Sequence, residues 1–141
     1  MTDRDNSIDA EVMDIMKRYP RLFRTGSSTK SRGPMHDGFL CDPGWYPLLD
    51  RLFGDIDAIC REDDLTGIKV SQVKQKLGGL RVYVQGGNDR VNDRIRQAEA
   101  EAAATCEGCG GSSPGIRSIG GYVTNVCDPC LNKRKKELLD R

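Results

Sequence analysis

The sequence predicts an α+β protein in which a small helix-and-hairpin domain is fused to a C-terminal, treble-clef-like zinc finger with four cysteine ligands. The prediction rests on two C-x-x-C motifs in the last third of the chain, one long amphipathic helix, and two Gly-Gly pairs that each separate β-type segments. We expect residues 1–41 to form a helix and a basic flexible loop, residues 42–105 a helix–β-hairpin–helix core, and residues 106–141 the finger with a basic C-terminal helix.

The composition is that of a globular protein with a polar surface. Of the 141 residues, 37% are hydrophobic and 30% are charged, which argues against a disordered chain and against a membrane protein. No apolar run is long enough to span a bilayer and the first residues do not form a signal peptide, so we expect a cytoplasmic protein. The net charge is only +1, but residues 17–35 and 66–87 contain cations and no acids, which indicates distinct charged faces.

The N-terminal segment is predicted to be a helix followed by a long loop. The helix covers residues 8–19, with its N-cap at Asn6 or Ser7, and it ends at Pro20. Residues 24–44 contain turn formers and cations without periodicity, which is typical of a loop. The cations of this loop either order against a polyanion or an acidic partner, or remain solvated: Arg24, Lys30 and Arg32.

The clearest helix of the chain follows Asp42 and Pro43, a pair that favours a helix start. Apolar residues recur on one face at steps of three and four, and charged residues occupy the other face. The apolar stripe consists of Trp45, Leu48, Leu49, Leu52, Phe53, Ile56, Ile59 and Cys60. Because it lies on this stripe, Trp45 is better interpreted as a core residue than as a ligand-stacking one, and Cys60 as a core thiol.

Two strands joined by Gly78-Gly79 are expected next, in a register that pairs Leu77 with Leu80. This register turns one face towards the Trp45 helix: Val73, Leu77, Leu80, Val82 and Val84. A change of phase predicts a bulge near Ser71. The other face carries Lys74, Lys76, Arg81 and Tyr83. Three cations around an aromatic ring suit phosphate binding and base stacking, but an ordinary solvated sheet face is the simpler interpretation.

A second amphipathic helix is predicted from a cap at Asn88 to about Thr105. Its narrow inner stripe contains Val91, Ile95, Ala98 and Ala102. The helix runs directly into Cys106, so we expect the C-terminal unit to be held rigidly against the core.

The cysteine spacing predicts one structural Zn²⁺ in a closed tetrahedral site formed by Cys106, Cys109, Cys127 and Cys130. Gly108 and Gly110 are expected to supply positive φ angles. Disulfides and a redox motif are weaker interpretations, because the chain has no signal peptide and neither pair follows a strand of a βαβ unit.

The residues around the cysteines predict a hairpin and a helix. Segments 116–119 and 122–126 flank Gly120-Gly121, and a helix is expected from Cys130 to Leu139, started by Asp128-Pro129. Knuckle, hairpin and then a helix that supplies the last ligand is the treble-clef order, and so small a unit should depend on its metal for folding. The helix is basic, with Lys133, Arg134, Lys135 and Lys136.

The C-terminal spacing resembles that of GATA-type fingers and of the C-terminal finger of DksA/TraR-type polymerase-binding proteins. The GATA resemblance implies that the four cysteines bind zinc and that residues 133–136 belong to a DNA-reading helix, although residues 110–117 lack the Trp-Arg-Arg core of those fingers. The DksA resemblance implies contact with RNA polymerase, although no long coiled-coil hairpin with an acidic tip precedes the finger.

A wider pattern covers about residues 44–130. It reads G-W-x-x-L-L-D-R-L from Gly44, V-K-x-K-x-G-G-L-R from Val73 and C-E-x-C-G from Cys106. This pattern resembles small uncharacterised zinc-finger proteins of bacteriophages and prophages. The resemblance implies a phage context, hence the host-cell cytoplasm, and assigns no activity to any residue.

Enzymatic interpretations have little support. The single histidine, His36, cannot build a histidine-rich centre, and a four-cysteine zinc site leaves no open position for a substrate. His36 and Cys41 would be a nucleophile pair without an orienting framework.

We therefore expect a non-enzymatic phage-type zinc-finger accessory protein whose basic surfaces engage nucleic acid or a nucleoprotein complex. The alternative is a phage-encoded inhibitor of a host defence system, such as an anti-CRISPR, that acts by protein–protein binding. A structural role in the virion is a third hypothesis. The sequence indicates neither a membrane nor a small-molecule substrate.

Overall fold

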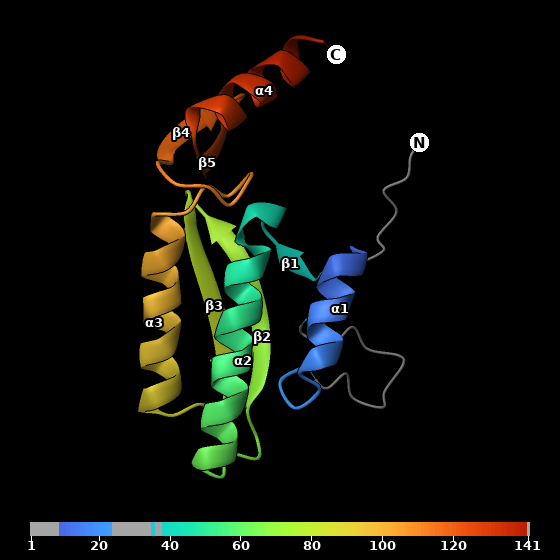
Figure 1. Ribbon diagram of the computed structural model, residues 1–141, viewed down its shortest axis with the longest axis vertical. Helices are drawn as coiled ribbons and strands as arrows, with labels where there is room; N and C mark the ends of the chain where they lie inside the picture. Colours follow the sequence, from blue (N-terminus) through green and yellow to red (C-terminus); the bar gives the residue numbers. More distant parts are fainter. Residues whose placement is uncertain (1–8, 24–34, 36–37, 141) are drawn as a thin grey trace.

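The computed structural model describes residues 9–23, 35 and 38–140, which form an α+β fold (Figure 1). Helices α2 (Tyr46–Glu62) and α3 (Asp89–Ala103) lie side by side against a three-stranded sheet. Its strands, in order, are β1 (Phe39–Leu40), β2 (Lys69–Lys76) and β3 (Gly79–Gln85). At one end of this layer, the hairpin of β4 (Gly115–Ile119) and β5 (Tyr122–Val126) leads into α4 (Asp128–Leu139). No helix in the described part of the chain is long and apolar enough to cross a membrane. Several predictions fall outside these residues, namely those for Asn6, Ser7, Arg24, Lys30, Arg32 and His36.

Helix α1 (Ala10–Arg18) begins at Asp9, whose side chain accepts a hydrogen bond from the Glu11 N–H at 2.9 Å. This carboxylate sets the cap, so the predicted start at residue 8 is wrong. Val12 and Ile15 are buried as predicted. At the other end of the helix, the Tyr19 hydroxyl donates to Asp50 Oδ1 at 2.7 Å. Burial and the Asp50 carboxylate raise the pKa of Tyr19 to about 12, so the hydroxyl keeps the proton that it donates to α2.

Strand β1 (Phe39–Leu40) pairs in parallel with β2, with Phe39 opposite Val73. The prediction that residues 24–44 form a loop is therefore wrong at this point. Phe39 is buried beside Phe23 and Phe53, whose rings meet edge to face at a centroid distance of 4.9 Å. Two residues are too few to show a period in the sequence, so the pattern of residues could not reveal this strand. The aromatic contacts of Phe39 are what distinguish it in the structure.

Helix α2 follows the short 3-10 helix η1 (Pro43–Trp45). The predicted stripe faces the core, with only Ile59 partly exposed, and Trp45 is fully buried. Asp42 precedes η1 but its side chain makes no capping hydrogen bond, so the predicted capping role is wrong. Its carboxylate instead forms an ion pair with Arg134 of α4.

The hairpin of β2 (Lys69–Lys76) and β3 (Gly79–Gln85) differs from the predicted register. Lys76 pairs with Gly79, so the turn residues are Leu77 and Gly78, with φ of 53° and 86°. Positive φ at both positions is the type I′ geometry that fits the twist of a hairpin. Leu77 is consequently 71% exposed instead of facing the core. The predicted bulge is confirmed, because the register shifts between Val70 and Gln72.

Helix α3 begins at Asn88, whose side chain accepts from the Val91 N–H at 3.0 Å, and its predicted inner stripe is buried. It also covers the free edge of the sheet, since Glu99 Oε2 accepts from the Val82 N–H at 3.3 Å. Helix α4 starts at Asp128, two residues earlier than predicted, with Cys127 as N-cap. Asp128 therefore does not cap the helix and instead pairs with Arg117 on β4 at 2.8 Å.

The turn geometry leads to a stability prediction. Leucine in the left-handed region costs about 1 kcal/mol, and the exposed Leu77 side chain recovers little of it by burial. Leu77→Asn, which creates the favoured Asn-Gly turn, should raise the free energy of unfolding by about 0.5–1 kcal/mol in urea titrations. Leu77→Ala keeps the strain and should give no gain. A less stable Leu77→Asn protein would contradict the register.

Candidate metal centre and basic sheet face

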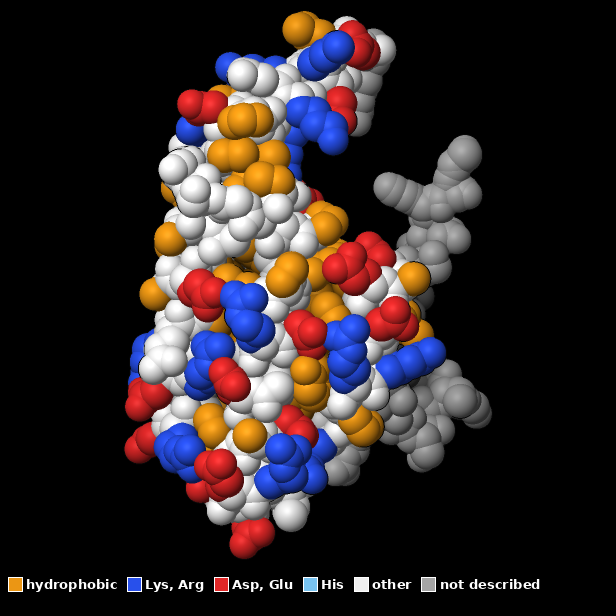
Figure 2. All heavy atoms as spheres, viewed as in Figure 1, with side chains coloured by type: hydrophobic (Ala, Val, Ile, Leu, Met, Phe, Trp, Pro, Cys, Tyr) orange, Lys and Arg blue, Asp and Glu red, His pale blue; other side chains and the backbone are white. Residues whose placement is uncertain are grey.

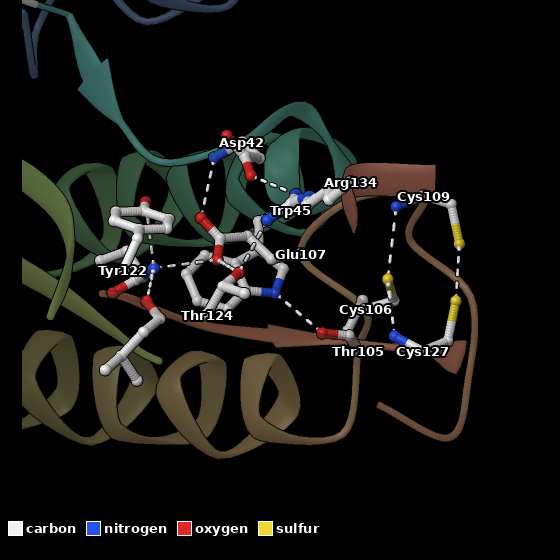
Figure 3. A network of polar contacts seen from close by, with 12 residues as sticks. Asp42, Trp45, Thr105, Cys106, Glu107, Cys109, Tyr122, Thr124, Cys127 and Arg134 are labelled. Atoms are coloured by element: carbon white, nitrogen blue, oxygen red, sulfur yellow. Dashed lines mark hydrogen bonds and ion pairs between the residues drawn. The ribbon is translucent and has the colours of Figure 1, made fainter. Parts of the chain in front are cut away.

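The four predicted thiols come together just beyond the end of α3, and Figure 3 shows three of them, Cys106, Cys109 and Cys127. Cys106 and Cys109 lie on the loop after the helix, Cys127 precedes α4, and Cys130 lies in its first turn. Their sulfur atoms all lie within 4.8 Å of one another, and those of Cys109 and Cys127 are 3.8 Å apart. Four thiolates around a tetrahedral ion at about 2.3 Å would be about 3.8 Å apart. The cluster is therefore compatible with a metal site.

Backbone N–H groups point at the Cys106 sulfur. Those of Cys127 and Cys109 lie 3.3 Å and 3.5 Å from it. Burial acts to raise the pKa of Cys106, but the N–H groups of Cys127, Cys109 and Gly108 outweigh it and lower the pKa to about 6. Burial and hydrogen bonds from the neighbouring thiols raise the pKa of Cys130 to about 12. The local backbone thus favours the thiolate at Cys106, and the Gly111 N–H also points at the Cys109 sulfur at 3.4 Å.

The two glycines of the knuckle have different roles. Gly110 has φ of +81°, as predicted. Gly108 does not have a positive φ, so that prediction is wrong. A Cβ atom at Gly108 would lie 3.0 Å from the Cys130 sulfur and 3.3 Å from Arg134 Nη2. Residue 108 must therefore be small because α4 packs against it.

Glu107, between the first two cysteines, is a fully buried carboxylate at the centre of the network in Figure 3. Its Oε2 accepts from the Asp42 N–H at 3.0 Å, and its Oε1 accepts from Thr124 Oγ1 at 2.8 Å and Gln75 Nε2 at 3.1 Å. These donors belong to the segment before η1, to β5 and to β2. Sequence reasoning missed Glu107, and no local signal marks it, because its donors are 17 to 65 residues away.

The knuckle backbone also contacts the core directly. The Gly44 N–H donates to the Glu107 carbonyl at 2.7 Å, and Trp45 Nε1 donates to the Thr105 carbonyl at 2.9 Å. A Cβ atom at Gly44 would lie only 2.3 Å from the Glu107 oxygen. Residue 44 therefore has to be glycine for the two parts to approach this closely.

The predicted cations of α4 divide into two groups. Arg134 is engaged with its own protein: it donates to Thr124 Oγ1 at 3.0 Å and pairs with the Asp42 carboxylate. Lys133, Lys135 and Lys136 are exposed. Helix α4 has no fully buried residue, and Arg134 connects it to Thr124 and Asp42.

The structure places the other predicted binding residues together on the outer face of β2 and β3. Lys74 lies opposite Arg81, and the Lys74 Nζ atom is 5.9 Å from the centre of the Tyr83 ring, a cation–π contact. Tyr83 is 44% exposed, and Lys76 lies further along the same face. The predicted register was wrong, but the prediction of which residues share the outer face is still correct. The observed pairing differs from the predicted one by two residues, and a shift of two leaves each side chain on the same face of the sheet.

The outer face of β2 and β3 differs from the helical side of the molecule in how its charged side chains are paired. Figure 2 shows basic and acidic side chains intermixed over α2 and α3. Most arginines in the described ranges have a carboxylate within 4.0 Å: Arg18, Arg21, Arg51, Arg61, Arg90, Arg94, Arg96, Arg117 and Arg134. Within those ranges, Arg81 is the one arginine without such a partner, and none of the described lysines, Lys74 and Lys76 among them, has one.

A groove of about 330 Å³ continues this face between the tip of the β2–β3 hairpin and β4. Lys76 and Arg81 line it together with Leu77 and Ile116. The two hairpins touch here, since a Cβ atom at Gly78 would lie 2.5 Å from Ile116 Cδ1. Sequence reasoning missed the groove because it forms between segments about 40 residues apart.

The remaining cysteines are held as neutral thiols. Burial, with the carboxylates of Glu107 and Asp42, raises the pKa of Cys41 far above its ordinary value. Burial likewise raises the pKa of Cys60, which is 2% exposed, as expected for a core thiol. Neither thiol has the depressed pKa that a nucleophilic cysteine requires.

Comparison of the chain with protein-family models, with curated proteins and with solved structures finds no match. The resemblances to phage and prophage proteins, to GATA-type fingers and to DksA/TraR-type proteins therefore stay predictions. What the protein does has to be inferred from its own residues.

The close contact between Gly44 and the Glu107 carbonyl can be tested by adding a single methyl group at residue 44. Gly44→Ala should lower the free energy of unfolding by at least about 2 kcal/mol, because the knuckle carbonyls cannot move away without breaking the Glu107 contacts. Gly67→Ala is the matched control, since a Cβ atom there meets nothing within 4 Å. Urea unfolding of both variants measures the difference. Equal stabilities would show that the knuckle does not sit against η1.

Proposed function

We propose that the protein is a non-enzymatic, zinc-stabilised nucleic-acid-binding protein. One observation carries the proposal: Arg81, Lys74 and Lys76 share an exposed face with Tyr83 and have no carboxylate partner among the described residues. Neighbouring cations repel one another, so a face of this kind favours a polyanion. Phosphates would contact the cations, and the tyrosine ring offers a surface for a base.

The metal in this proposal is one structural Zn²⁺. The sulfur separations fit tetrahedral thiolate ligation, for which zinc and iron–sulfur centres are the usual occupants. The β4–β5 hairpin followed by α4, whose first turn holds Cys130, supports a treble-clef arrangement around a single ion. When bound, zinc would supply four bonds that hold the knuckle, and no open position for a substrate.

Metal content tests this assignment. Freshly purified protein should contain about one zinc ion per chain by plasma mass spectrometry, and a strong chelator should abolish much of its near-ultraviolet circular dichroism. Cys127→Ser should lose the metal, whereas Cys41→Ala should retain it, because Cys41 lies outside the cluster. Substantially less than one zinc per chain would refute the assignment, and iron with visible absorption would indicate an iron–sulfur centre instead.

The binding surface can be tested by comparing two variants that lose the same three positive charges from different faces. The variant Lys74→Ala, Lys76→Ala, Arg81→Ala should bind labelled oligonucleotides at least tenfold more weakly at low salt, and the slope of log K against log salt should fall by about 2. Arg61→Ala, Arg90→Ala, Arg96→Ala removes the same charge from exposed ion pairs of the helical side, where it costs little stability. This control should bind like the unmodified protein. If the unmodified protein fails to retard DNA or RNA at low salt, nucleic-acid binding is excluded.

A second candidate function, inhibition of a host defence system by protein–protein binding, draws support from α4. This helix has no buried residue, and it exposes Leu138 by 43% and Leu139 by 85% beside its lysines. Exposed leucines on an unburied helix suit a protein partner. A pull-down from host lysate that recovers a defence complex with the unmodified protein, and loses it with Leu138→Asp, would favour this function.

A further inference from the structure

The groove next to the basic sheet face differs chemically from the rest of that face. One rim carries Lys76 and Arg81, while Leu77, Pro114 and Ile116 form apolar walls. Leu77 and Ile116 are 71% and 60% exposed. Large apolar side chains that gather in a concave, cation-rimmed site are typical of a ligand with an apolar body and a negative group.

Leu77 supplies an independent observation. It occupies a left-handed turn position at φ of 53°, where asparagine or glycine would be relaxed and leucine is strained. The strain is not offset by burial, because the side chain is 71% exposed where it lines the groove. Uncompensated backbone strain is characteristic of residues that serve a site rather than the fold.

A polar group completes the groove. Asn125 lines it and is only 2% exposed, and its side-chain nitrogen donates to the Ala103 carbonyl at 3.0 Å. No donor from the described residues reaches its side-chain oxygen. A buried acceptor without a partner favours a ligand with N–H groups. Nucleobases combine such groups with a flat apolar body.

The arrangement of the Tyr83 ring and the groove favours a single strand over a duplex as the ligand. The outer face runs from Tyr83 to Gly79 over about 13 Å of strand, and the groove begins where the strand ends. In a duplex the base faces are stacked on their neighbours, so neither the Tyr83 ring nor the groove can reach one. An unpaired strand can place one base on the ring and turn another into the groove.

We infer that the sheet face binds single-stranded nucleic acid, with one base on Tyr83, another in the groove between Leu77 and Ile116, and phosphates at Lys74, Lys76 and Arg81. This inference rests on the proposed nucleic-acid binding and narrows it to one class of ligand. It assigns three residues to one surface: the strained Leu77, the exposed Ile116, and Arg81, which donates to the Leu80 carbonyl at 3.0 Å and has no carboxylate partner among the described residues.

Fluorescence anisotropy of a labelled mixed-sequence oligonucleotide of about 12 nucleotides, as DNA, as RNA and as each duplex, tests the inference. Single strands should bind at least tenfold more tightly than duplexes at the same salt concentration. The DNA and RNA arms then identify which strand is preferred. Tyr83→Ala should weaken single-strand binding about 5- to 100-fold, whereas Tyr83→Phe, which keeps the ring, should bind normally.

Leu77→Asn gives a test that misfolding cannot explain, because this variant should be more stable and yet bind single strands several-fold more weakly. Met13→Asn, which alters an exposed apolar residue that does not line the groove, is its matched control and should bind normally. Equal affinity for single strands and duplexes, or a preference that survives both Tyr83→Ala and Leu77→Asn, would overturn the groove assignment and leave nucleic-acid binding intact. Absence of binding to any oligonucleotide would overturn both.

Discussion

The buried carboxylate of Glu107 determines how the C-terminal unit sits on the rest of the protein. Transferring a carboxylate from water to a protein interior costs several kcal/mol unless donors replace its hydration. Glu107 obtains three donors, and they come from the segment before η1, from β2 and from β5. Moving the unit would break the bonds from Asp42 and Gln75, and Glu107 would keep only the Thr124 donor of its own unit. The contact therefore specifies an orientation, which a purely apolar contact would do less strictly.

Gln75 extends this constraint from the metal centre to the sheet. Its side-chain nitrogen donates to Glu107 and to the Val123 carbonyl, and its oxygen accepts from the Gly78 N–H in the hairpin turn. One amide thus connects the knuckle, β5 and the turn that carries Leu77. Because these connections bring the turn against Ile116, the groove exists only while the C-terminal unit is docked. The cysteine cluster can then influence a surface that it does not touch.

Whether a feature of this structure can be predicted from the sequence depends on how far apart in the chain its interacting residues lie. The α2 stripe, the Asn88 cap and the cysteine cluster are recognisable because periodicity and spacing are local properties. The Gly-Gly pair was ambiguous, because Leu77-Gly78 and Gly78-Gly79 both permit a two-residue turn, and the choice between them coincides with contacts of Gln75 to β5. Strand β1 depends on an aromatic cluster, and Glu107 depends on donors in three distant elements. Such features follow from tertiary structure, which a single sequence does not display.

Arginines and lysines make different contacts in this protein, and the difference affects what the proposed surface could recognise. Arginines other than Arg81 are used in the described structure for ion pairs, whereas the cations near the sheet face and on α4 are mostly lysines. A lysine ammonium is a point charge that holds a phosphate without reading sequence, while a guanidinium can form paired hydrogen bonds with a base edge. On the proposed function Arg81 contacts a phosphate, so Asn125, which lines the groove, is the group placed to discriminate between bases. Any sequence preference should therefore be confined to the base in the groove, and most of the affinity should be independent of sequence and sensitive to salt.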